Sequence, residues 1–265
     1  MVRKQDNTNR RNVLKTIGAS AIGFSTVGTV TAKRENQFRR DVDQARKLRE
    51  KTGENNKFIE YLQKKGYAVK SNTVHDKVHL GGNDGPSTQR LSSDELTATI
   101  NVSAWHRNCN PDPYDVYAEY YFEWNMNGGS GDGDKDGFSV GWPASDFQYE
   151  ENSATSSSNV DFHTRDNSLN AVFFKYDDTG LGGYWGDDYD SGYGGCYMNT
   201  ESGYGDSSTF AGKWAHTYDN LTICGASASG SGEPSWSFCN DGKKDYMGFT
   251  QTDYSEADQY WANCQ

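Results

Sequence analysis

Hydrophobic and polar residues alternate along two stretches in the middle of the chain. At residues 96–104, Leu, Ala, Ile, Val and Ala occupy every second position, and Thr, Asn and Ser fill the positions between them. At residues 116–124, Val, Ala, Tyr, Phe and Trp alternate in the same way with Tyr and Glu. A period of two is typical of strands that bury one face, so both stretches are predicted to be half-buried strands.

Shorter runs of aromatic and β-branched residues follow, separated by turns rich in Gly, Asp, Asn and Ser. They predict further strands at 137–142, 170–176, 208–218, 220–227, 234–239 and 245–251. After Ala104 the chain has only three leucines and one isoleucine, which excludes a helical core of ordinary composition. The predicted fold is therefore mainly β, an antiparallel β-sandwich (jelly-roll-like) over residues 94–265.

A helical pattern precedes the strands. Phe38, Val42, Ala45 and Leu48 share one face of a predicted amphipathic helix over 36–51. Gly53 suits its C-terminal cap, and a second helix is predicted from Asn55 or Asn56 to Gly66, with Phe58, Ile59 and Leu62 on its apolar side. Residues 33–70 thus form a basic helical hairpin, and residues 71–93 are expected to be a polar linker.

A hairpin of this length cannot build a core of its own, so it must lie on another surface. Three arrangements are open. It is a pro-segment or clamp that docks on the rest of the chain, a pair of amphipathic helices on a membrane surface, or a helical cap on the fold.

Residues 1–32 have the organisation of an export signal. Arg10 and Arg11 precede an apolar stretch at 16–30, and Val30-Thr31-Ala32 gives a small-residue cleavage site. The arginine pair resembles the twin-arginine signal, so we expect the twin-arginine translocase to be the partner during export. Fifteen apolar and small residues are short for a bilayer span, so no stable transmembrane segment is expected in the mature protein, which would be secreted or held at the cell surface. The other interpretation of this stretch is a helix that anchors the chain in the membrane.

Charge divides the chain into the same parts. The net charge is +4 over residues 1–32, +6 over 33–70 and −21 over 71–265. Concentrated salt screens such self-repulsion, since the Debye length falls to about 3 Å at 1 M, so the acidic part indicates adaptation to brine. The alternative is a surface that attracts cations or basic partners. A nucleic-acid partner is not expected, because the acidic part has no basic stripe.

The five cysteines all lie in the acidic part. Cys224 and Cys239 flank a turn-like segment between two predicted strands, so a disulfide across that hairpin is expected. A second bridge between Cys109 and Cys264 would tie the last strand to the sheet, and it leaves Cys196 unpaired. There is no C-x-x-C spacing, so zinc is not expected.

Two acidic segments are candidate binding sites. Asp132, Asp134 and Asp136 precede Gly137 at the spacing of a calcium loop, although Pro143 stands where such a loop needs Glu, so calcium is the one cofactor considered. The other interpretation is an acidic turn. Tyr184, Trp185 and Tyr189 lie beside acids and would stack on the sugars of a cell-surface glycan, or form a structured loop.

Catalytic chemistry is not indicated. A glycosidase needs two carboxylates about 5–9.5 Å apart, and no spacing singles out such a pair. His216, in K-W-A-H-T-Y, is expected to pack among aromatic rings with its ring nitrogens hydrogen-bonded.

Several strings carry a family resemblance. G-F-S-V-G-W (137–142), N-A-V-F-F-K-Y-D-D (170–178) and W-A-H-T-Y-D-N-L-T-I (214–223) follow R-K-L-R-E-K-T-G and Y-L-Q-K-K-G in the helical segment. With the twin-arginine signal, they resemble a group of secreted haloarchaeal proteins that are mainly β. The resemblance implies export and salt adaptation, and it carries no catalytic residue.

The favoured hypothesis is an exported, halophilic β-sandwich protein with a binding or cell-envelope role. The first alternative is a secreted polysaccharide hydrolase. The second is the precursor of a secreted antimicrobial, halocin-like protein from which residues 33–93 are removed.

The export signal gives a direct test. Replacing both Arg10 and Arg11 with Lys should leave the precursor inside the cell, because the twin-arginine route reads the arginine pair. Immunoblots of cells and medium measure the distribution. Secretion of the double-lysine variant at the wild-type level would contradict the assignment.

Overall fold

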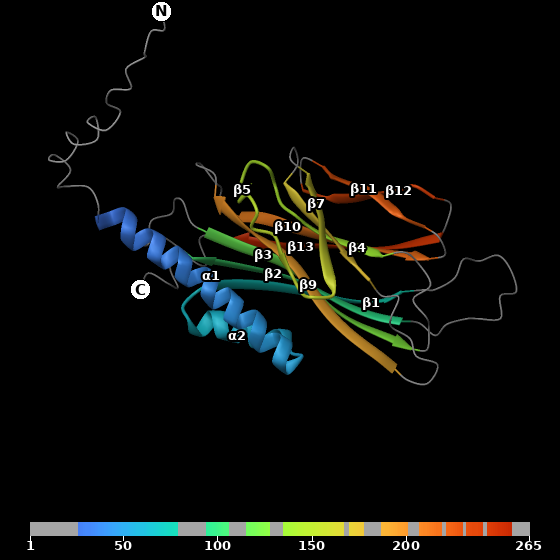
Figure 1. Ribbon diagram of the computed structural model, residues 1–265, viewed down its shortest axis with the longest axis horizontal. Helices are drawn as coiled ribbons and strands as arrows, with labels where there is room; N and C mark the ends of the chain where they lie inside the picture. Colours follow the sequence, from blue (N-terminus) through green and yellow to red (C-terminus); the bar gives the residue numbers. More distant parts are fainter. Residues whose placement is uncertain are drawn as a thin grey trace, which may run out of the picture.

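The computed structural model describes residues 26–78, 94–105, 115–127, 135–166, 170–177, 187–200, 207–218, 221–229, 232–240 and 243–255. Two helices come first, followed by strands (Figure 1). The helices are α1 (Thr26–Thr52) and α2 (Asn55–Lys64). The strands are β1 (Ala68–Val78), β2 (Asp94–Trp105), β3 (Asp115–Asn127), β4 (Asp136–Gly141), β5 (Phe147–Tyr149), β6 (Thr155–Ser156), β7 (Val160–Asp166), β8 (Ala171–Tyr176), β9 (Asp187–Thr200), β10 (Ser207–Tyr218), β11 (Ile223–Ala228), β12 (Pro234–Phe238) and β13 (Lys243–Ser255).

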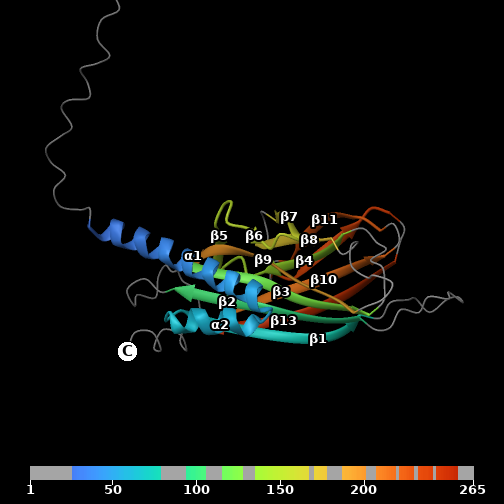
Figure 2. The same cartoon turned by 60° about the horizontal axis from the view of Figure 1, so that its bottom comes forward.

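The strands form two facing sheets and one small hairpin. Sheet A has the order β1-β2-β3-β9-β5, with β6 also paired to β9, and sheet B has the order β13-β10-β4-β8-β7. All pairings are antiparallel. The helices lie on the outer side of sheet A, and β11 and β12 lie at the opposite side of the molecule (Figures 1 and 2). The predicted antiparallel sandwich is confirmed.

The strand order differs from the jelly-roll-like order that the sequence suggested. The strands β1, β2 and β3 are neighbours in one sheet and form a meander, and β7 and β8 form a hairpin in the other. A jelly roll instead pairs strands through two Greek keys.

Aromatic rings fill the space between the sheets, as the low leucine content predicted. The alternating apolar residues of β2 and β3, from Leu96 to Trp124, all lie in this core. Sheet B contributes Phe138, whose ring stacks on Trp214 with centroids 5.6 Å apart and on Phe174 at 5.3 Å. Such pairs stabilise beyond the area they bury, by about 0.5–1.5 kcal/mol each.

The polar face of sheet A is buried as well, which corrects the expectation of half-buried strands. Asn101, Ser103 and Glu119 are each 0% exposed. The reason is the helical hairpin, because Phe38, Val42 and Leu62 pack with Tyr117 and Tyr197 of that face in a second apolar cluster, whose members are Phe38, Val42, Ala45, Phe58, Leu62, Val69, Tyr117 and Tyr197. The helices therefore act as a cap on the fold.

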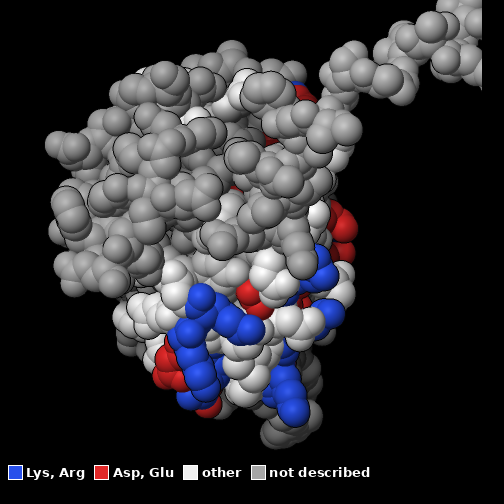
Figure 3. All heavy atoms as spheres, turned by 90° about the vertical axis from the view of Figure 1, so that its left-hand side faces the viewer, with Lys and Arg blue, Asp and Glu red and all other residues white. Residues whose placement is uncertain are grey.

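The helical hairpin itself matches its prediction closely. Gly53 and Gly66 follow the two helices with φ of 70° and 86°, a left-handed conformation that glycine adopts without strain. The helix α1 begins at Thr26 rather than at residue 36, since no proline interrupts the preceding residues. Neither helix, within the described residues, combines the length and hydropathy needed to cross a bilayer. Lys and Arg side chains gather on the face of the molecule that the helices occupy (Figure 3).

A buried ion pair joins the hairpin to sheet A. Both guanidinium nitrogens of Arg49 donate to the carboxylate of Glu119, at 3.1 Å for Nη2 to Oε2, and the two side chains are 2% and 0% exposed. Asn101 and the Tyr117 hydroxyl also donate to Glu119, at 3.0 and 2.9 Å. Burial raises the pKa of Glu119, but the charge of Arg49 and these hydrogen bonds outweigh it and hold the pKa below its usual value.

Aromatic rings enclose the same guanidinium. The Cζ atom of Arg49 lies 4.3 Å from the Tyr121 ring centroid and 4.8 Å from those of Phe58 and Tyr193. Arg46, three residues before Arg49 in α1, lies over Tyr117 and donates to the Thr155 hydroxyl at 2.5 Å. These contacts position the hairpin in one register on the sheet.

Residues 71–78 are strand rather than linker, which corrects the predicted domain boundary. They belong to β1, which pairs with β2 from Ala68 opposite Ala104 to Val78 opposite Asp94. The stretch looks like a linker because β1 is an edge strand, and edge strands tolerate polar and charged residues such as Lys70 and Asn72.

The strand β9 was not predicted, because its D-S-G-Y-G-G pattern has the composition of a loop. Its glycines are required by the partners it meets. A Cβ at Gly194 would lie 2.5 Å from the Phe174 ring, and one at Gly192 would lie 2.6 Å from Phe122. Aromatic side chains of the core therefore fill the space that β9 leaves free.

The hairpin of β11 and β12 covers the outer face of sheet B. Ile223 and Trp236 pack there against Phe173 and Ala171. The disulfide between Cys224 and Cys239, predicted from their positions in the sequence, closes this hairpin with a Cα–Cα distance of 5.6 Å.

The buried ion pair leads to a stability prediction. Replacing Glu119 with Gln should lower the free energy of unfolding by about 3–5 kcal/mol, because Arg49 stays buried without its counter-charge. Denaturant unfolding should show a similar loss of unfolding free energy in concentrated and in dilute salt, since salt screens a buried ion pair little. The difference in free energy of unfolding between the wild type and Glu119→Gln should decrease as pH falls below about 4.3. A carboxylate whose pKa is lowered in the folded state loses its contribution to stability on acidification.

Two controls separate the ion pair from general disruption. Glu123→Gln changes a carboxylate on the same face of β3 that is partly exposed, and it should cost less than about 1 kcal/mol. The double variant Arg49→Met with Glu119→Leu removes both charges and should recover most of the loss. A Glu119→Gln protein as stable as the wild type would contradict the assignment.

The packing of the hairpin and β1 also predicts how the chain behaves when a protease cuts it. If a protease cuts the chain between β1 and β2, the two fragments should co-elute in native gel filtration and separate only in denaturant. Release of the amino-terminal fragment from a body that stays folded would instead support the antimicrobial-precursor hypothesis. Intact mass and gel filtration of secreted protein distinguish these outcomes.

Candidate functional site

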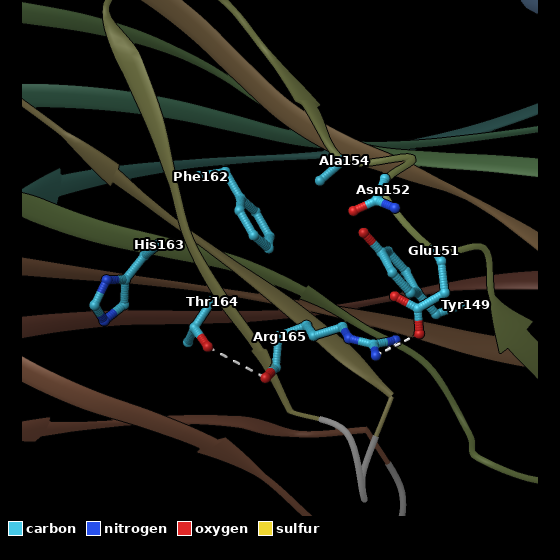
Figure 4. A pocket seen from close by; sticks show the side chains of 8 residues that line it. All are labelled: Tyr149, Glu151, Asn152, Ala154, Phe162, His163, Thr164 and Arg165. Carbon is cyan, nitrogen blue, oxygen red and sulfur yellow. Dashed lines mark hydrogen bonds and ion pairs between the residues drawn. The ribbon is translucent and has the colours of Figure 1, made fainter. Parts of the chain in front are cut away.

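A groove of about 480 Å³ lies between an edge of sheet A and an edge of sheet B. One wall is the strand β7 at the edge of sheet B, and the other is the segment from β5 to β6 beside β9. The residues that line it are Tyr149, Glu151, Asn152, Ala154, Phe162, His163, Thr164 and Arg165 (Figure 4). This volume is in the range of small-molecule sites.

The wall between β5 and β6 is held in place by hydrogen bonds to β9. The Ser153 hydroxyl donates to the Tyr197 carbonyl at 3.0 Å and accepts from the Tyr197 amide at 3.1 Å. The Glu150 amide donates to the same carbonyl at 3.0 Å. Asn152 has φ of 60°, so the chain turns sharply there and places Glu151 at the groove. The wall is therefore formed before any ligand arrives.

Arg165 connects the two walls. Its Cζ atom lies 4.8 Å from the centroid of the Tyr149 ring, and its Nη2 lies 2.5 Å from Oε1 of Glu151. The Arg165 side chain is 30% exposed and that of Glu151 is 66% exposed. Burial raises the pKa of Tyr149, so its hydroxyl stays protonated at neutral pH. The ring therefore supports a fixed guanidinium, whose ion-pair partner faces solvent.

Phe162 provides an apolar surface in the same groove. Its side chain is 46% exposed, and its ring contacts the core through an edge-to-face pair with Phe174 at 5.8 Å. A register irregularity in β7 between Phe162 and Thr164 changes the local alternation. Figure 4 shows Phe162 and Arg165 directed to the side of Tyr149 and Glu151.

His163 points to the other side of β7 in the same view. Its ring stacks on Trp236 of β12, with centroids 6.3 Å apart. Burial, and then the charge of Lys175, lower the pKa of His163, so its ring is neutral at pH 7. It therefore adds no positive charge to the groove.

A second groove of about 460 Å³ lies between the loop that joins the helices and the outer face of sheet A. It contains two carboxylates, Glu54 and Glu123, with His75 and several threonines. The Tyr121 hydroxyl donates to Glu123 at 2.9 Å, and Glu54 lies 3.9 Å from the Lys57 amine. No Phe, Tyr or Trp is among its described lining residues, so it lacks an apolar surface for a ligand ring.

The predicted calcium ligands are only partly described. Asp132 and Asp134 lie outside the described residues, and Asp136 is 0% exposed in β4. The Asp136 carboxylate accepts from Trp214 Nε1 at 3.1 Å and from the Thr217 amide at 2.9 Å, and it lies 2.8 Å from His216 Nδ1. Within the described ranges no group of three His, Cys, Asp or Glu residues is placed to hold a metal. Calcium binding remains a prediction.

The environment of His216 matches its prediction. Its ring packs 4.9 Å from that of Trp124, and the side chain is 4% exposed beside Asp136.

The other sequence candidates lie mostly outside the described residues. Tyr184, Trp185, Cys109 and Cys264 belong to that group, as do Arg10 and Arg11. Tyr189 lies in β9 opposite Asn125, and its side chain is not described. Cys196 is unpaired and buried in the core, where burial raises the pKa of its thiol.

The groove was missed by sequence analysis because β5, β6 and β7 were not predicted. Regular alternation would place Phe162 and Arg165 on opposite faces of a strand, so no sequence signal showed that the irregularity in β7 brings them to one side. Nothing in the sequence indicated that Tyr149 would lie under Arg165.

Comparisons with known proteins assign no function to this groove. No family model and no curated protein matches the chain. A solved structure described as a pore forming protein aligns with a TM-score of 0.38 at 6% identity, covering 73% of this chain and 93% of that chain. The full-length RrgB pilus protein of Streptococcus pneumoniae aligns with a TM-score of 0.27 at 8% identity, covering 57% of this chain and 23% of that chain. The collagen adhesin CNA of S. aureus aligns with a TM-score of 0.25 at 10% identity, covering 60% of this chain and 68% of that chain.

Proposed function

We propose that this chain is an exported binding protein of salt environments, and that its groove binds a saccharide at the cell exterior. The observation that carries the proposal is Phe162, a residue that is 46% exposed and lies at the groove beside polar side chains. An exposed aromatic ring that lies in a concave groove with a few polar side chains is typical of small-molecule sites.

The chemistry of the groove suits a sugar. A pyranose ring has an apolar C–H face and an equatorial belt of hydroxyl groups. Phe162 offers an aromatic surface, and Asn152 and Arg165 offer hydrogen-bonding groups in the same groove. The volume of about 480 Å³ accommodates one or two sugar rings.

Binding is favoured over hydrolysis by the carboxylates of this groove. A glycosidase requires two acids that flank the scissile bond. Glu151 is the one carboxylate among the described lining residues, and it is paired with Arg165. The polysaccharide-hydrolase alternative therefore lacks a second acid here, and the antimicrobial-precursor alternative would require removal of a hairpin that neutralises Glu119.

Export and adaptation to brine are part of the same proposal. They rest on the arginine pair Arg10-Arg11 and on the net charge of −21 after residue 70. The disulfide between Cys224 and Cys239 adds support, because disulfides persist in oxidising compartments outside the cytoplasm.

The proposal predicts that Phe162 contributes directly to binding. Phe162→Ala should weaken retention on immobilised polysaccharides by roughly 3- to 10-fold, which corresponds to the loss of one aromatic contact. Affinity electrophoresis in concentrated KCl, with a panel of neutral and acidic polysaccharides, measures the change.

Tyr61→Ala is the matched control, because this aromatic residue is partly exposed on α2, away from the groove. It should leave retention unchanged. If the wild type binds no member of the panel, or if both variants behave alike, the groove is not a saccharide site.

A further inference from the structure

We infer that the groove selects acidic saccharides. The carboxylate of the ligand displaces Glu151 and pairs with Arg165 in its place. This inference rests on the proposed function and specifies its ligand class. The ligand would be a polymer or oligomer with uronate units, which carry a planar carboxylate on a sugar ring.

The presence of Arg165 is the first argument. Residues 94–265 contain two arginines, Arg107 and Arg165, in a part of the chain dominated by Asp and Glu. One of these two side chains lies in the groove and is stacked on an aromatic ring. No other Lys or Arg lines the groove among the described residues, and the nearby Lys175 donates to the Ile223 carbonyl at 2.9 Å. The positive charge of the groove therefore comes from Arg165.

The geometry of the ion pair is the second argument. Arginine binds carboxylates through two parallel N–H donors, and stacking on Tyr149 fixes the plane of the guanidinium. In the structure Glu151 takes this place, with its Oε1 2.5 Å from Nη2 of Arg165. The Glu151 side chain is more than twice as exposed as that of Arg165. An exposed ion pair contributes little, so an incoming carboxylate replaces Glu151 at small cost. Glu151 therefore acts as an internal competitor for the ligand.

The position of Phe162 is the third argument. Phe162 and Arg165 extend from the same strand toward the opposite wall (Figure 4). A sugar ring that packs on Phe162 brings its substituents to the side of Arg165. A uronate satisfies both groups at once, whereas a neutral sugar leaves Arg165 paired with Glu151. Concentrated salt screens the long-range repulsion between an acidic ligand and the acidic protein. The short-range contacts with Phe162 and Arg165 therefore determine whether an acidic or a neutral saccharide binds better.

The experiment compares two ligands that differ only at C6 of each sugar, where one has a carboxylate and the other a neutral hydroxymethyl group. The probes are tetragalacturonate and its carboxyl-reduced neutral form, and calorimetry in concentrated KCl measures both affinities. The wild type should prefer tetragalacturonate by roughly 10-fold or more, as expected for a bidentate charged contact. Arg165→Gln should abolish the preference, and Arg165→Lys should restore only part of it, because lysine lacks the two-donor fork.

Glu151→Gln gives the sharpest test, because its effect has the opposite sign. Removal of the competing carboxylate should strengthen tetragalacturonate binding several-fold and leave the neutral form unchanged. A purely structural role of Glu151 would weaken binding of both probes. Arg39→Gln is the matched control, since Arg39 also pairs with a glutamate, Glu150, and lies 4.6 Å over a tyrosine ring, but outside the groove.

The outcomes separate the inference from the proposed function. Equal binding of both probes by the wild type, or weaker tetragalacturonate binding by Glu151→Gln, would overturn the acidic-ligand inference while the saccharide site stands. If the wild type binds neither probe nor any polysaccharide of the panel, the proposed function itself fails.

Discussion

A carboxylate at the centre of a sheet constrains this whole molecule. Glu119 is 0% exposed on β3, and an ion in such a place is tolerated only when a counter-charge and hydrogen-bond donors surround it. Arg49 supplies the charge from a helix 70 positions earlier in the chain, while Asn101 and Tyr117 complete the hydrogen bonds. The basic helical segment is thus bound to the acidic part by a contact that salt screens little.

Two faces that look solvent-exposed in the sequence are covered in the fold. The helices bury the polar side of sheet A, and β11 and β12 bury part of the outer side of sheet B. Each β4 residue is buried as a result. Where a face is covered, a ligand can approach at the edge of the sheet. The groove between β7 and the β5–β6 segment is such an edge.

The two arginine sites show how burial changes the role of one residue type. Arg49 is enclosed by rings and a buried carboxylate, so its environment leaves no room for exchange of partners. Arg165 has the same kinds of neighbour, a tyrosine ring and a glutamate, but its glutamate is 66% exposed. The first arrangement stabilises the fold, and the second suits the exchange of one carboxylate for another.

The sequence alone determined the elements whose residues follow a clear period. The alternation in β2 and β3, the apolar stripes of the two helices and the cysteines of the β11–β12 hairpin depend on neighbours along the chain, so they were predictable. The strands β1 and β9 were not, because an edge position permits the polar residues of β1 and the rings of Phe122 and Phe174 require the glycines of β9.

Only the tertiary structure decided the candidate site and the strand order. Tyr149, Glu151, Phe162 and Arg165 belong to short or irregular segments, whose partners are chosen by the packing of two sheets rather than by local preference. The same holds for the pairing of Arg49 with Glu119 among the many charges of the chain. Sequence periodicity reports which face of an element is apolar, but it carries no record of which distant side chain will lie opposite, since that depends on how the layers come together.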